Sequence, residues 1–142
     1  MLSVAGILKN KKNEMYSVTS NTTVYDAIKL MSEKNIGAVP VVDNDILSGI
    51  FSERDYARKI VLLNRRSQDT LIKDIMTVTV LTVSPNDTID HCMGIMSSKK
   101  IRHLPVLQDN KMIGIISIGD VVTAIIESQK ETINHLQNYI TQ

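Results

Sequence analysis

The sequence has no tryptophan, one phenylalanine and a single cysteine in 142 residues. Because aromatic side chains are so scarce, we do not expect stacking platforms for single-stranded nucleic acid. Aliphatic and methionine side chains must therefore fill the core. The lone Cys92 excludes an intramolecular disulfide and favours a reducing compartment, by default the cytoplasm. The 43% hydrophobic and 22% charged content is ordinary for a globular protein.

An excess of charge of one sign is also missing, since the formal net charge is +1 and the isoelectric point is near 7.8. A chain this close to neutrality has no long-range field to attract nucleic acid or an acidic membrane. No apolar run approaches the roughly 20 residues that span a bilayer. The N-terminal stretch MLSVAGILKNKKNE lacks the apolar core of a signal peptide. We therefore expect neither nucleic acid nor a membrane as a partner.

An internal repeat organises the chain. A shift of 65 residues, without gaps, superposes residues 18–60 on residues 83–125 with many identities. A constant offset over such a length indicates a duplication. A unit of roughly 60 residues buries only a modest part of its surface, so the two copies are expected to pack face to face as one module. The identical pairs include Val18/Val83, Asn21/Asn86, Thr23/Thr88, Met31/Met96, Ile36/Ile101, Pro40/Pro105, Gly49/Gly114, Ser52/Ser117 and Asp55/Asp120.

Each copy shows the same succession of predicted elements. Apolar residues recur at i, i+3, i+4 and i+7, which predicts an amphipathic helix behind an N-cap of Asn, Asp or Thr. Two short apolar runs around an Asx-rich turn predict a hairpin. A strand before the helix and a second helix after the hairpin complete a β-α-β-β-α unit. In the two copies, the strand is predicted at 15–18 and 80–83, the N-cap at 21–23 and 86–88, the helix from Val24 and Ile89, the hairpin at 38–51 and 104–116, and the second helix from near Glu53 and Ile118.

The sequence thus predicts a mixed α/β protein of the α+β kind, built from two pseudo-two-fold-related repeats. Repeat 1 with its N-terminal segment is expected at 1–64, and the polar stretch at 65–74 is interpreted as a linker. Repeat 2 with an extended C-terminal helix is expected at 75–142. The pair Ile75-Met76 ahead of the second copy resembles Ile7-Leu8 ahead of the first, with a three-residue change of register.

The last predicted helix continues past the end of the repeat. Its stripe has the spacing 4-3-4-3-4, which is typical of a coiled-coil seam. We expect the stripe to pack against another subunit or against the body of its own chain; a frayed terminal helix is the alternative. The stripe consists of Val122, Ile126, Gln129, Ile133, Leu136 and Ile140.

Signals for catalysis and metal binding are weak. His91 and Cys92 are neighbours on a predicted helix and point to different faces, so a nucleophilic pair is not expected, and Cys92 occupies the core position of Ala27 in the first copy. His91, His103 and His135 show no metal-ligand spacing. The chain has no GxxxxGK[ST] loop and no GxGxxG after a strand. We therefore expect a protein that is not an enzyme and has no metal site.

The doubled motifs resemble a tandem pair of cystathionine β-synthase (CBS) domains, often called a Bateman module. The resemblance rests on IGAVPVVDNDILSGIFSERD at 36–55 and IRHLPVLQDNKMIGIISIGD at 101–120, with DIMT at 74–77 and SPNDTI at 84–89. It covers nearly the whole chain. It implies two clefts between the sheets of the copies, which in this family hold AMP, ADP, ATP, dinucleotides such as NAD, or S-adenosylmethionine. It also implies homodimers, which in this family often form a flat disc of four CBS units.

The shared Ser-x-x-Asp motif has two interpretations. The first is a capping box, in which a hydroxyl at the N-cap and an acid three residues later stabilise the helix start. The second, implied by the resemblance, is that Asp55 or Asp120 accepts both hydroxyls of a ribose. Ser52 or Ser117 and nearby backbone N–H groups would then bind a phosphate or ribose oxygen at the positive helix end. One carboxylate can do both, capping the empty state and binding sugar when occupied.

Cationic residues around the motif differ between the copies. Arg54 and Arg58 lie four apart on one helix face, whereas Arg102 and His103 precede Pro105 in the other copy. A guanidinium group can donate two parallel bonds to a phosphate. We therefore expect these cationic residues to line the polyphosphate side of the central cleft; for each of them, a solvated surface charge is the alternative.

The resemblance also implies a base-contacting loop, at 36–38 and 101–103, and an opposing strand end, at 18–20 and 83–85. The Gly37-Ala38 pair lets a backbone approach closely. The bulkier Arg102-His103 predicts a second site that is narrower or reads phosphate more than base. The candidate nucleotide-binding residues are, for site 1, Val18, Thr19, Ser20, Ile36, Gly37, Ala38, Pro40, Ser52, Arg54, Asp55 and Arg58, and, for site 2, Val83, Ser84, Pro85, Ile101, Arg102, His103, Pro105, Ser117 and Asp120.

These observations favour a cytoplasmic regulatory module that binds an adenosine nucleotide without chemistry and senses energy or redox state. The ligand would be AMP, ADP, ATP, NAD or S-adenosylmethionine. A homodimer is expected, and the output would act on a separate, unidentified effector protein or through the C-terminal helix. Two alternatives remain open, a ligand-free structural dimerisation module and a nucleotide hydrolase.

Overall fold

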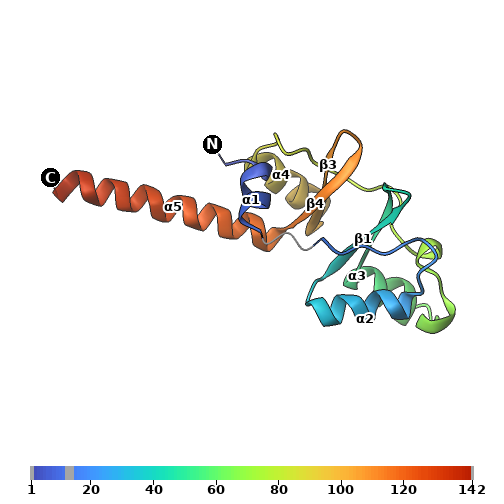
Figure 1. The fold of residues 1–142 in the computed structure, drawn as a ribbon. Coiled ribbons are helices and arrows are strands. Elements are labelled where there is room, and N and C mark those ends of the chain that lie inside the picture. Colours follow the sequence, from blue (N-terminus) through green and yellow to red (C-terminus); the bar gives the residue numbers. More distant parts are fainter. Residues whose placement is uncertain (1, 12–14, 142) are drawn as a thin grey trace. The chain divides into compact units, whose positions relative to one another are not determined.

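The computed structural model describes residues 2–11 and 15–141, which form two compact units (Figure 1). Of the described residues, unit 1 contains 2–11, 82–108 and 114–141, and unit 2 contains 15–81 and 109–113. The predicted mixture of helices with two small sheets is confirmed. In chain order the elements are α1 (Val4–Asn10), α2 (Val24–Lys34), β1 (Ala38–Asp43), β2 (Ile46–Ser52), α3 (Glu53–Asp55), the π-helix η1 (Tyr56–Val61), the 3₁₀ turns η2 (Ser67–Asp69) and η3 (Ile72–Asp74), α4 (Ile89–Lys99), β3 (His103–Gln108), β4 (Lys111–Ser117) and α5 (Ile118–Thr141).

Both predicted amphipathic helices, α2 and α4, are confirmed, and each begins at a threonine cap. The Thr23 hydroxyl accepts a hydrogen bond from the Asp26 N–H at 3.2 Å. The Thr88 hydroxyl accepts one from the His91 N–H at 3.1 Å. Such caps satisfy backbone donors that the first helical turn leaves unpaired. The buried faces follow the predicted spacing, with Val24, Ala27 and Met31 on α2 and Ile89, Cys92 and Met96 on α4.

The two predicted hairpins are also confirmed, since β1 pairs with β2 and β3 with β4. Their turns place Asn44-Asp45 and Asp109-Asn110 at positive φ, between 51° and 66°. Asn and Asp adopt this conformation more readily than most residues, which suits two-residue hairpin turns. The β1–β2 register shifts after Val41, because Val41 faces Gly49 and Val42 faces Leu47. The shift leaves Ser48 as an extra residue in β2, as in a β-bulge.

The predicted strands at 15–18 and 80–83 were wrong in extent. Each is reduced to one parallel bridge, Val18 with Val41 and Val83 with Val106. Val18 donates its N–H to the Pro40 carbonyl at 3.0 Å, and Val83 donates to the Pro105 carbonyl at 3.1 Å. The next parallel bond toward the N-terminus would need the N–H of the proline, which proline lacks. The two equivalent prolines therefore end the ladder after one residue.

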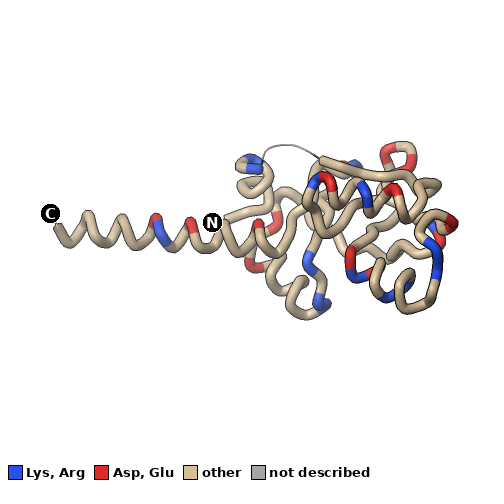
Figure 2. The backbone as a smooth tube through the Cα atoms, turned by 90° about the horizontal axis from the view of Figure 1, so that it is seen from below, with Lys and Arg blue, Asp and Glu red and all other residues tan. Residues whose placement is uncertain are grey.

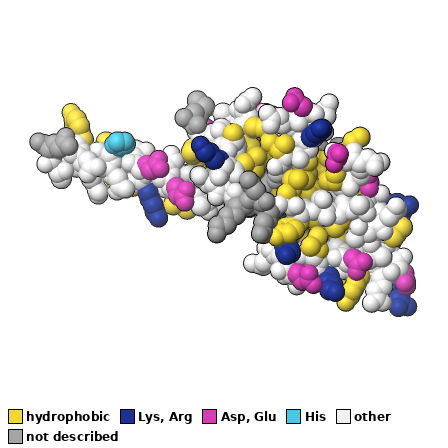
Figure 3. Space-filling model, viewed as in Figure 1, with side chains coloured by type: hydrophobic (Ala, Val, Ile, Leu, Met, Phe, Trp, Pro, Cys, Tyr) yellow, Lys and Arg dark blue, Asp and Glu magenta, His cyan; other side chains and the backbone are white. Residues whose placement is uncertain are grey.

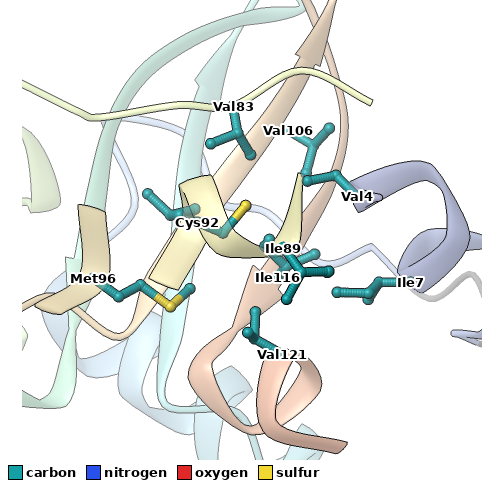
Figure 4. Packing of buried hydrophobic residues seen from close by; sticks show 10 residues of the cluster. Val4, Ile7, Val83, Ile89, Cys92, Met96, Val106, Ile116 and Val121 are labelled. Carbon is teal, nitrogen blue, oxygen red and sulfur yellow. The ribbon is translucent and has the colours of Figure 1, made fainter. Parts of the chain in front are cut away.

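Each unit has its own hydrophobic core. In unit 1, Val4 and Ile7 of α1 point toward Ile89 and Ile116 (Figure 4). Cys92 lies in this core, as predicted, and burial raises the pKa of its thiol, to which the charge of Asp87 adds. The core of unit 2 consists of Val18, Val24, Ala27, Met31, Val39, Val41, Phe51, Ile60, Ile72 and Ile75.

The segment that precedes each repeat packs into the unit of the other repeat. Residues 2–8 contribute to unit 1, where the Ile89 N–H donates to the Leu2 carbonyl at 3.2 Å. In unit 2, the Val24 N–H donates to the Thr70 carbonyl at 2.9 Å. The two segments correspond at an offset of 68, which is the repeat offset of 65 plus the three-residue change of register noted between Ile7-Leu8 and Ile75-Met76.

The polar stretch interpreted as a linker is partly packed. Thr70 and Ile72 are buried, and Ile72 belongs to the core of unit 2. The division into 1–64, 65–74 and 75–142 describes the repeats along the chain and stays a prediction. The compact units group the chain differently, because α1 belongs with the residues of the second repeat.

Two equivalent glycines allow these segments to approach the sheets closely. A Cβ on Gly49 would lie 2.8 Å from the Thr77 carbonyl oxygen and 2.7 Å from the Met76 sulfur. A Cβ on Gly114 would meet the Leu8 Cδ2 methyl at 2.7 Å and its next neighbour only at 3.5 Å. Backbone cannot move aside as easily as the end of a flexible side chain.

We expect Gly49→Ala to lower the free energy of unfolding by about 1–3 kcal/mol, as overpacking typically does. Gly114→Ala serves as the matched substitution. It should lower the free energy of unfolding by less than about 1 kcal/mol, because Leu8 can change rotamer. Urea unfolding of both variants measures the difference. Equal costs would contradict the close backbone approach at Gly49.

Helix α5 extends well beyond α1 and α4 of its own unit (Figure 1). The predicted continuation past the repeat is confirmed, and the apolar positions of the stripe are exposed in the single chain. Among the described residues, no helix combines the length and apolarity that a bilayer crossing requires. The exposed fractions are 41% for Val122, 46% for Ile126, 53% for Ile133, 57% for Leu136 and 78% for Ile140.

Candidate functional site

In unit 2, Ser52 and Asp55 form a complete capping box. The Asp55 N–H donates to the Ser52 hydroxyl at 3.1 Å, while Asp55 Oδ2 accepts from the Ser52 N–H at 3.0 Å and from its hydroxyl at 3.1 Å. The capping interpretation is therefore confirmed here. The arrangement also fixes the carboxylate at the positive end of the helical segment.

The second oxygen of Asp55 makes two long contacts with described residues. Oδ1 lies 3.5 Å from the Thr77 hydroxyl and 3.5 Å from the Lys59 ammonium. Lys59 makes a shorter bond to the Ile75 carbonyl, at 2.9 Å. Contacts at 3.5 Å contribute little. Oδ1 is thus the oxygen that keeps acceptor capacity for a ligand, although the side chain as a whole is only 15% exposed.

In unit 1, Asp120 is bound more tightly. Its Oδ2 accepts from the Ser117 N–H at 2.8 Å and from the Lys11 ammonium at 2.9 Å. The Asp120 N–H donates to the Ser117 hydroxyl at 3.1 Å. Burial of the carboxyl acts to raise its pKa, but the bonds from Ser117 and Lys11 outweigh burial and hold the pKa of Asp120 below its ordinary value.

The predicted base-contacting loops lie beside these carboxylates in both units. The Gly37 carbonyl accepts from the Glu53 N–H at 3.1 Å, and the Arg102 carbonyl accepts from the Ile118 N–H at 2.8 Å. Each bond joins the loop to the first residue of the helix that carries the aspartate. Within each unit, the structure therefore places the loop that the family resemblance implied beside the Ser-x-x-Asp motif, and the role of both in nucleotide binding stays a prediction.

A surface hollow of about 460 Å³ adjoins this bond in unit 2. Its lining includes Ile36 and Gly37, two of the predicted base-contacting residues, together with Glu53. The lining combines apolar and polar residues. The remaining lining residues are Ile28, Met31, Ser32 and Asn35.

The predicted strand-end residues are held against the sheets. Val18 and Val83 contact the carbonyls of Pro40 and Pro105, as described above. Ser20 is hydrogen-bonded to Asp43, whose Oδ1 accepts from the Ser20 N–H at 3.0 Å and from the Ser20 hydroxyl at 3.1 Å. Asp43 also accepts from the hydroxyl of the bulged Ser48 at 2.6 Å. These bonds, that from the Ser20 N–H foremost, lower the pKa of Asp43.

The second copy lacks the residues of this network but keeps an equivalent turn. The residues at the repeat positions of Ser20, Asp43 and Ser48 are Pro85, Gln108 and Ile113. In the turn, Ser84 donates its N–H to Asp87 Oδ2 at 2.7 Å. In the first copy, Thr19 likewise donates its N–H to the Thr22 hydroxyl at 3.2 Å. Sequence reasoning missed Asp43, because only the folded hairpin brings it to Ser20.

The helical segment that carries Arg54 and Arg58 differs in geometry from its equivalent in unit 1. In unit 2, α3 has three residues and continues as the π-helix η1, in which Leu62 donates to the Ala57 carbonyl at 3.0 Å. Arg54 and Arg58 are exposed on this segment. π-turns are rare and often lie at functional sites. In unit 1 the equivalent helix, α5, is a regular α-helix.

The remaining cationic residues of the prediction lie in unit 1, where Arg102 is exposed and His103 is half-buried. Whether these residues share one polyphosphate site with Arg54 and Arg58 stays a prediction. Within residues 2–11 and 15–141, no group of three or more His, Cys, Asp or Glu side chains is arranged to hold a metal ion.

Comparison with known proteins identifies similar chains. A family model described as CBS domain matches residues 10–62 and 72–127. A solved CBS-domain protein from Burkholderia ambifaria is 52% identical, with a TM-score of 0.86 over 89% of this chain and 96% of that chain. The CBS domain pair of protein MJ0100, solved in complex with 5′-methylthioadenosine and S-adenosyl-L-methionine, is 27% identical, with a TM-score of 0.79 over 90% of this chain and 98% of that chain.

The chain is also similar in sequence to a plant protein with CBS domains. The CBS domain-containing protein CBSX3 of Arabidopsis thaliana, named as mitochondrial, is 43% identical over 127 residues. The match covers 86% of this chain and 62% of that protein. The chain thus spans less than two thirds of the length of this relative.

Proposed function

Because the chain belongs to the CBS-domain family and contains a pair of such domains, we propose that it is a regulatory module that binds an adenosine-containing ligand. Asp55 and Asp120 would accept the two hydroxyls of the ribose. The observation that carries this proposal is the recurrence, in both units, of a fixed carboxylate at a helix start beside a loop held by the Gly37 or Arg102 carbonyl.

The chemistry of the ligand in a similar protein supports this class. Protein MJ0100 binds 5′-methylthioadenosine and S-adenosyl-L-methionine. Both molecules contain an adenosine whose ribose has two neighbouring hydroxyls, as AMP, ADP, ATP and NAD do. An ionised carboxylate is a strong acceptor for such hydroxyls. The ribose is therefore the feature that the two aspartates would recognise in any of these ligands.

The arginines of unit 2 favour a ligand that also has phosphates. Arg54 and Arg58 follow Ser52 on the exposed side of α3 and η1. Arginine binds phosphate oxygens with two parallel bonds. We propose AMP, ADP, ATP or NAD for this unit, and the module would then report energy or redox state. Arg102 and His103 would give the same preference to the Asp120 site.

The module would act without chemistry, through a ligand whose affinity differs between two arrangements of the protein. Its target would be an unidentified effector protein, and its compartment the cytoplasm. The alternatives are a structural module that binds no nucleotide and a nucleotide hydrolase. The first predicts no ligand binding, and the second predicts accumulation of a cleaved product.

We further propose that α5 pairs with α5 of a second copy. Isoleucine at 126, 133 and 140 with leucine at 136 fits the a and d positions of a two-stranded parallel coiled coil. The outer turns of α5, at residues 132–141, contain no Lys, Arg, Asp or Glu (Figure 2). Hydrophobic side chains emerge on the surface of the projecting helix (Figure 3). The same uncharged outer part of α5 in a second copy is therefore a matching partner.

Calorimetric titration of the full chain tests the proposed function. The panel is AMP, ADP, ATP, NAD, S-adenosylmethionine and 5′-methylthioadenosine, with guanosine monophosphate as the base control. We expect at least one adenosine ligand to bind at tens of micromolar or tighter, without turnover. Absence of binding by all of them would overturn the proposal, and release of a cleaved product would favour the hydrolase.

A further inference from the structure

The Lys11 side chain contacts the carboxylate that we propose as the ribose acceptor of unit 1. Its Nζ lies 2.9 Å from Asp120 Oδ2 and donates to the Ile115 carbonyl at 2.8 Å. Lys11 follows the end of α1, so the contact joins residues 109 positions apart in the sequence. The ammonium group is thus held by two acceptors, one in β4 and one in the first turn of α5.

In unit 2, the equivalent acceptors are the Ile50 carbonyl and the Asp55 carboxylate, and they have other donors. The Ile50 carbonyl, which corresponds to that of Ile115, accepts from the backbone N–H of Thr77 at 2.9 Å. Asp55 has no cation closer than Lys59, at 3.5 Å, among the ion pairs of the described residues. Charge-assisted bonds are shorter and stronger than neutral ones. Asp120 is thus engaged by a cation from a distant part of the chain, whereas the ion pair of Asp55 given above is with Lys59 of its own helical segment.

The contact affects binding because the two ribose hydroxyls would need both oxygens of the carboxylate as acceptors, and the Lys11 ammonium already donates to one of them. Oδ2 of Asp120 already accepts from Lys11 and from the Ser117 N–H. The Asp120 side chain is only 23% exposed, whereas that of Lys11 is 38% exposed and can move into solvent. A ligand that approaches Asp120 can therefore displace Lys11 more easily than it can move the carboxylate.

We propose that Lys11 competes with the ribose for Asp120, so that unit 1 binds an adenosine ligand only when Lys11 leaves the carboxylate. The inference rests on the proposed function, since it takes Asp120 as the ribose acceptor. Two consequences follow. Unit 2 binds its ligand more tightly than unit 1, and occupation of unit 1 breaks the contact between Lys11 and Asp120 at the start of α5.

The test compares Lys11→Met with Lys9→Met, an exposed lysine on α1, in the full chain. Both are made with Asp55→Asn, so that the unit 1 site is measured alone. The probe is 5′-methylthioadenosine, which has no phosphate, so loss of a cation removes no phosphate contact. We expect Lys11→Met to bind 5′-methylthioadenosine about two- to fivefold more tightly than the chain with Lys11, because a half-exposed ion pair contributes a free energy of this size. Lys9→Met should leave the affinity unchanged.

A second measurement, without ligand, separates this inference from the proposed function. Carbon-13 NMR follows the Asp120 carboxyl as the pH is lowered. Because the Lys11 ammonium favours the ionised carboxylate, Lys11→Met should raise the pKa of Asp120. An unchanged pKa would show that the contact is not made and would overturn the inference, whatever the ligand does.

The combined outcomes are distinct. A raised pKa with unchanged or weaker ligand binding would overturn the competition but leave the ribose role of Asp120 intact, provided that Asp120→Ala then abolishes binding. Failure of Lys11→Met and of the wild-type chain to bind any adenosine ligand would overturn both proposals.

Discussion

Replacing Asp55 with alanine is expected to weaken binding of the adenosine ligand in unit 2 by roughly a hundredfold or more. The carboxylate would lose two hydrogen bonds to ribose hydroxyls, and bonds to an ionised group are each worth about 1.5–3 kcal/mol. Calorimetric titration of the full chain measures the loss. Since Lys11 competes at Asp120, the tighter of the two sites should be the one that disappears.

The helix cap complicates this substitution, because Asp55 also accepts the Ser52 N–H. Asp55→Asn keeps an oxygen for that bond but places an amide where the second ribose hydroxyl needs an acceptor. It should weaken binding with little change in the free energy of unfolding. Asp26→Ala, an exposed aspartate in the first turn of α2, is the control of the same unit. Equal ligand affinity in Asp55→Ala, Asp26→Ala and the wild-type chain would show that the site is wrongly assigned.

Replacing Ile133 with glutamate is expected to weaken dimerisation through α5 by about a hundredfold or more. The variant removes one isoleucine from each copy, and burial of such a side chain contributes about 1.5–3 kcal/mol. The two introduced carboxylates would also lie close together in the seam. Sedimentation velocity over a range of protein concentrations measures the dissociation constant of the dimer.

The neighbouring residue offers a matched control. Asn134 is exposed on the same turn of α5 but lies off the stripe, so Asn134→Glu should leave the dimer intact. Two results would contradict the pairing of α5 with a second copy. One is a wild-type chain that remains monomeric, and the other is a dimer that is equally stable in both variants.

The features that sequence predicted correctly depend on local patterns or on the repeat. The caps at Thr23 and Thr88 and the faces of α2 and α4 follow from spacing within one helix. The hairpin turns follow from pairs of Asn and Asp. The prediction that Ser-x-x-Asp and the loop at 36–38 act together came from the family resemblance, and the bond from Glu53 to Gly37 is the physical reason that they are adjacent.

The features that sequence missed depend on contacts between distant residues. The strands at 15–18 and 80–83 were predicted too long, although Pro40 and Pro105 already signalled that a neighbouring ladder would lack a donor. The resemblance of Ile7-Leu8 to Ile75-Met76 was visible, but only the structure shows in which unit each pair packs. No pattern in the sequence relates Lys11 to Asp120, because the contact depends on where α1 ends in three dimensions.

A crystal structure of the full chain with 5′-methylthioadenosine would show where the ribose binds. We expect the ribose hydroxyls to lie within hydrogen-bonding distance of the Asp55 carboxylate, with the base beside Ile36 and Gly37. A ligand bound with its ribose away from both Asp55 and Asp120 would contradict this expectation.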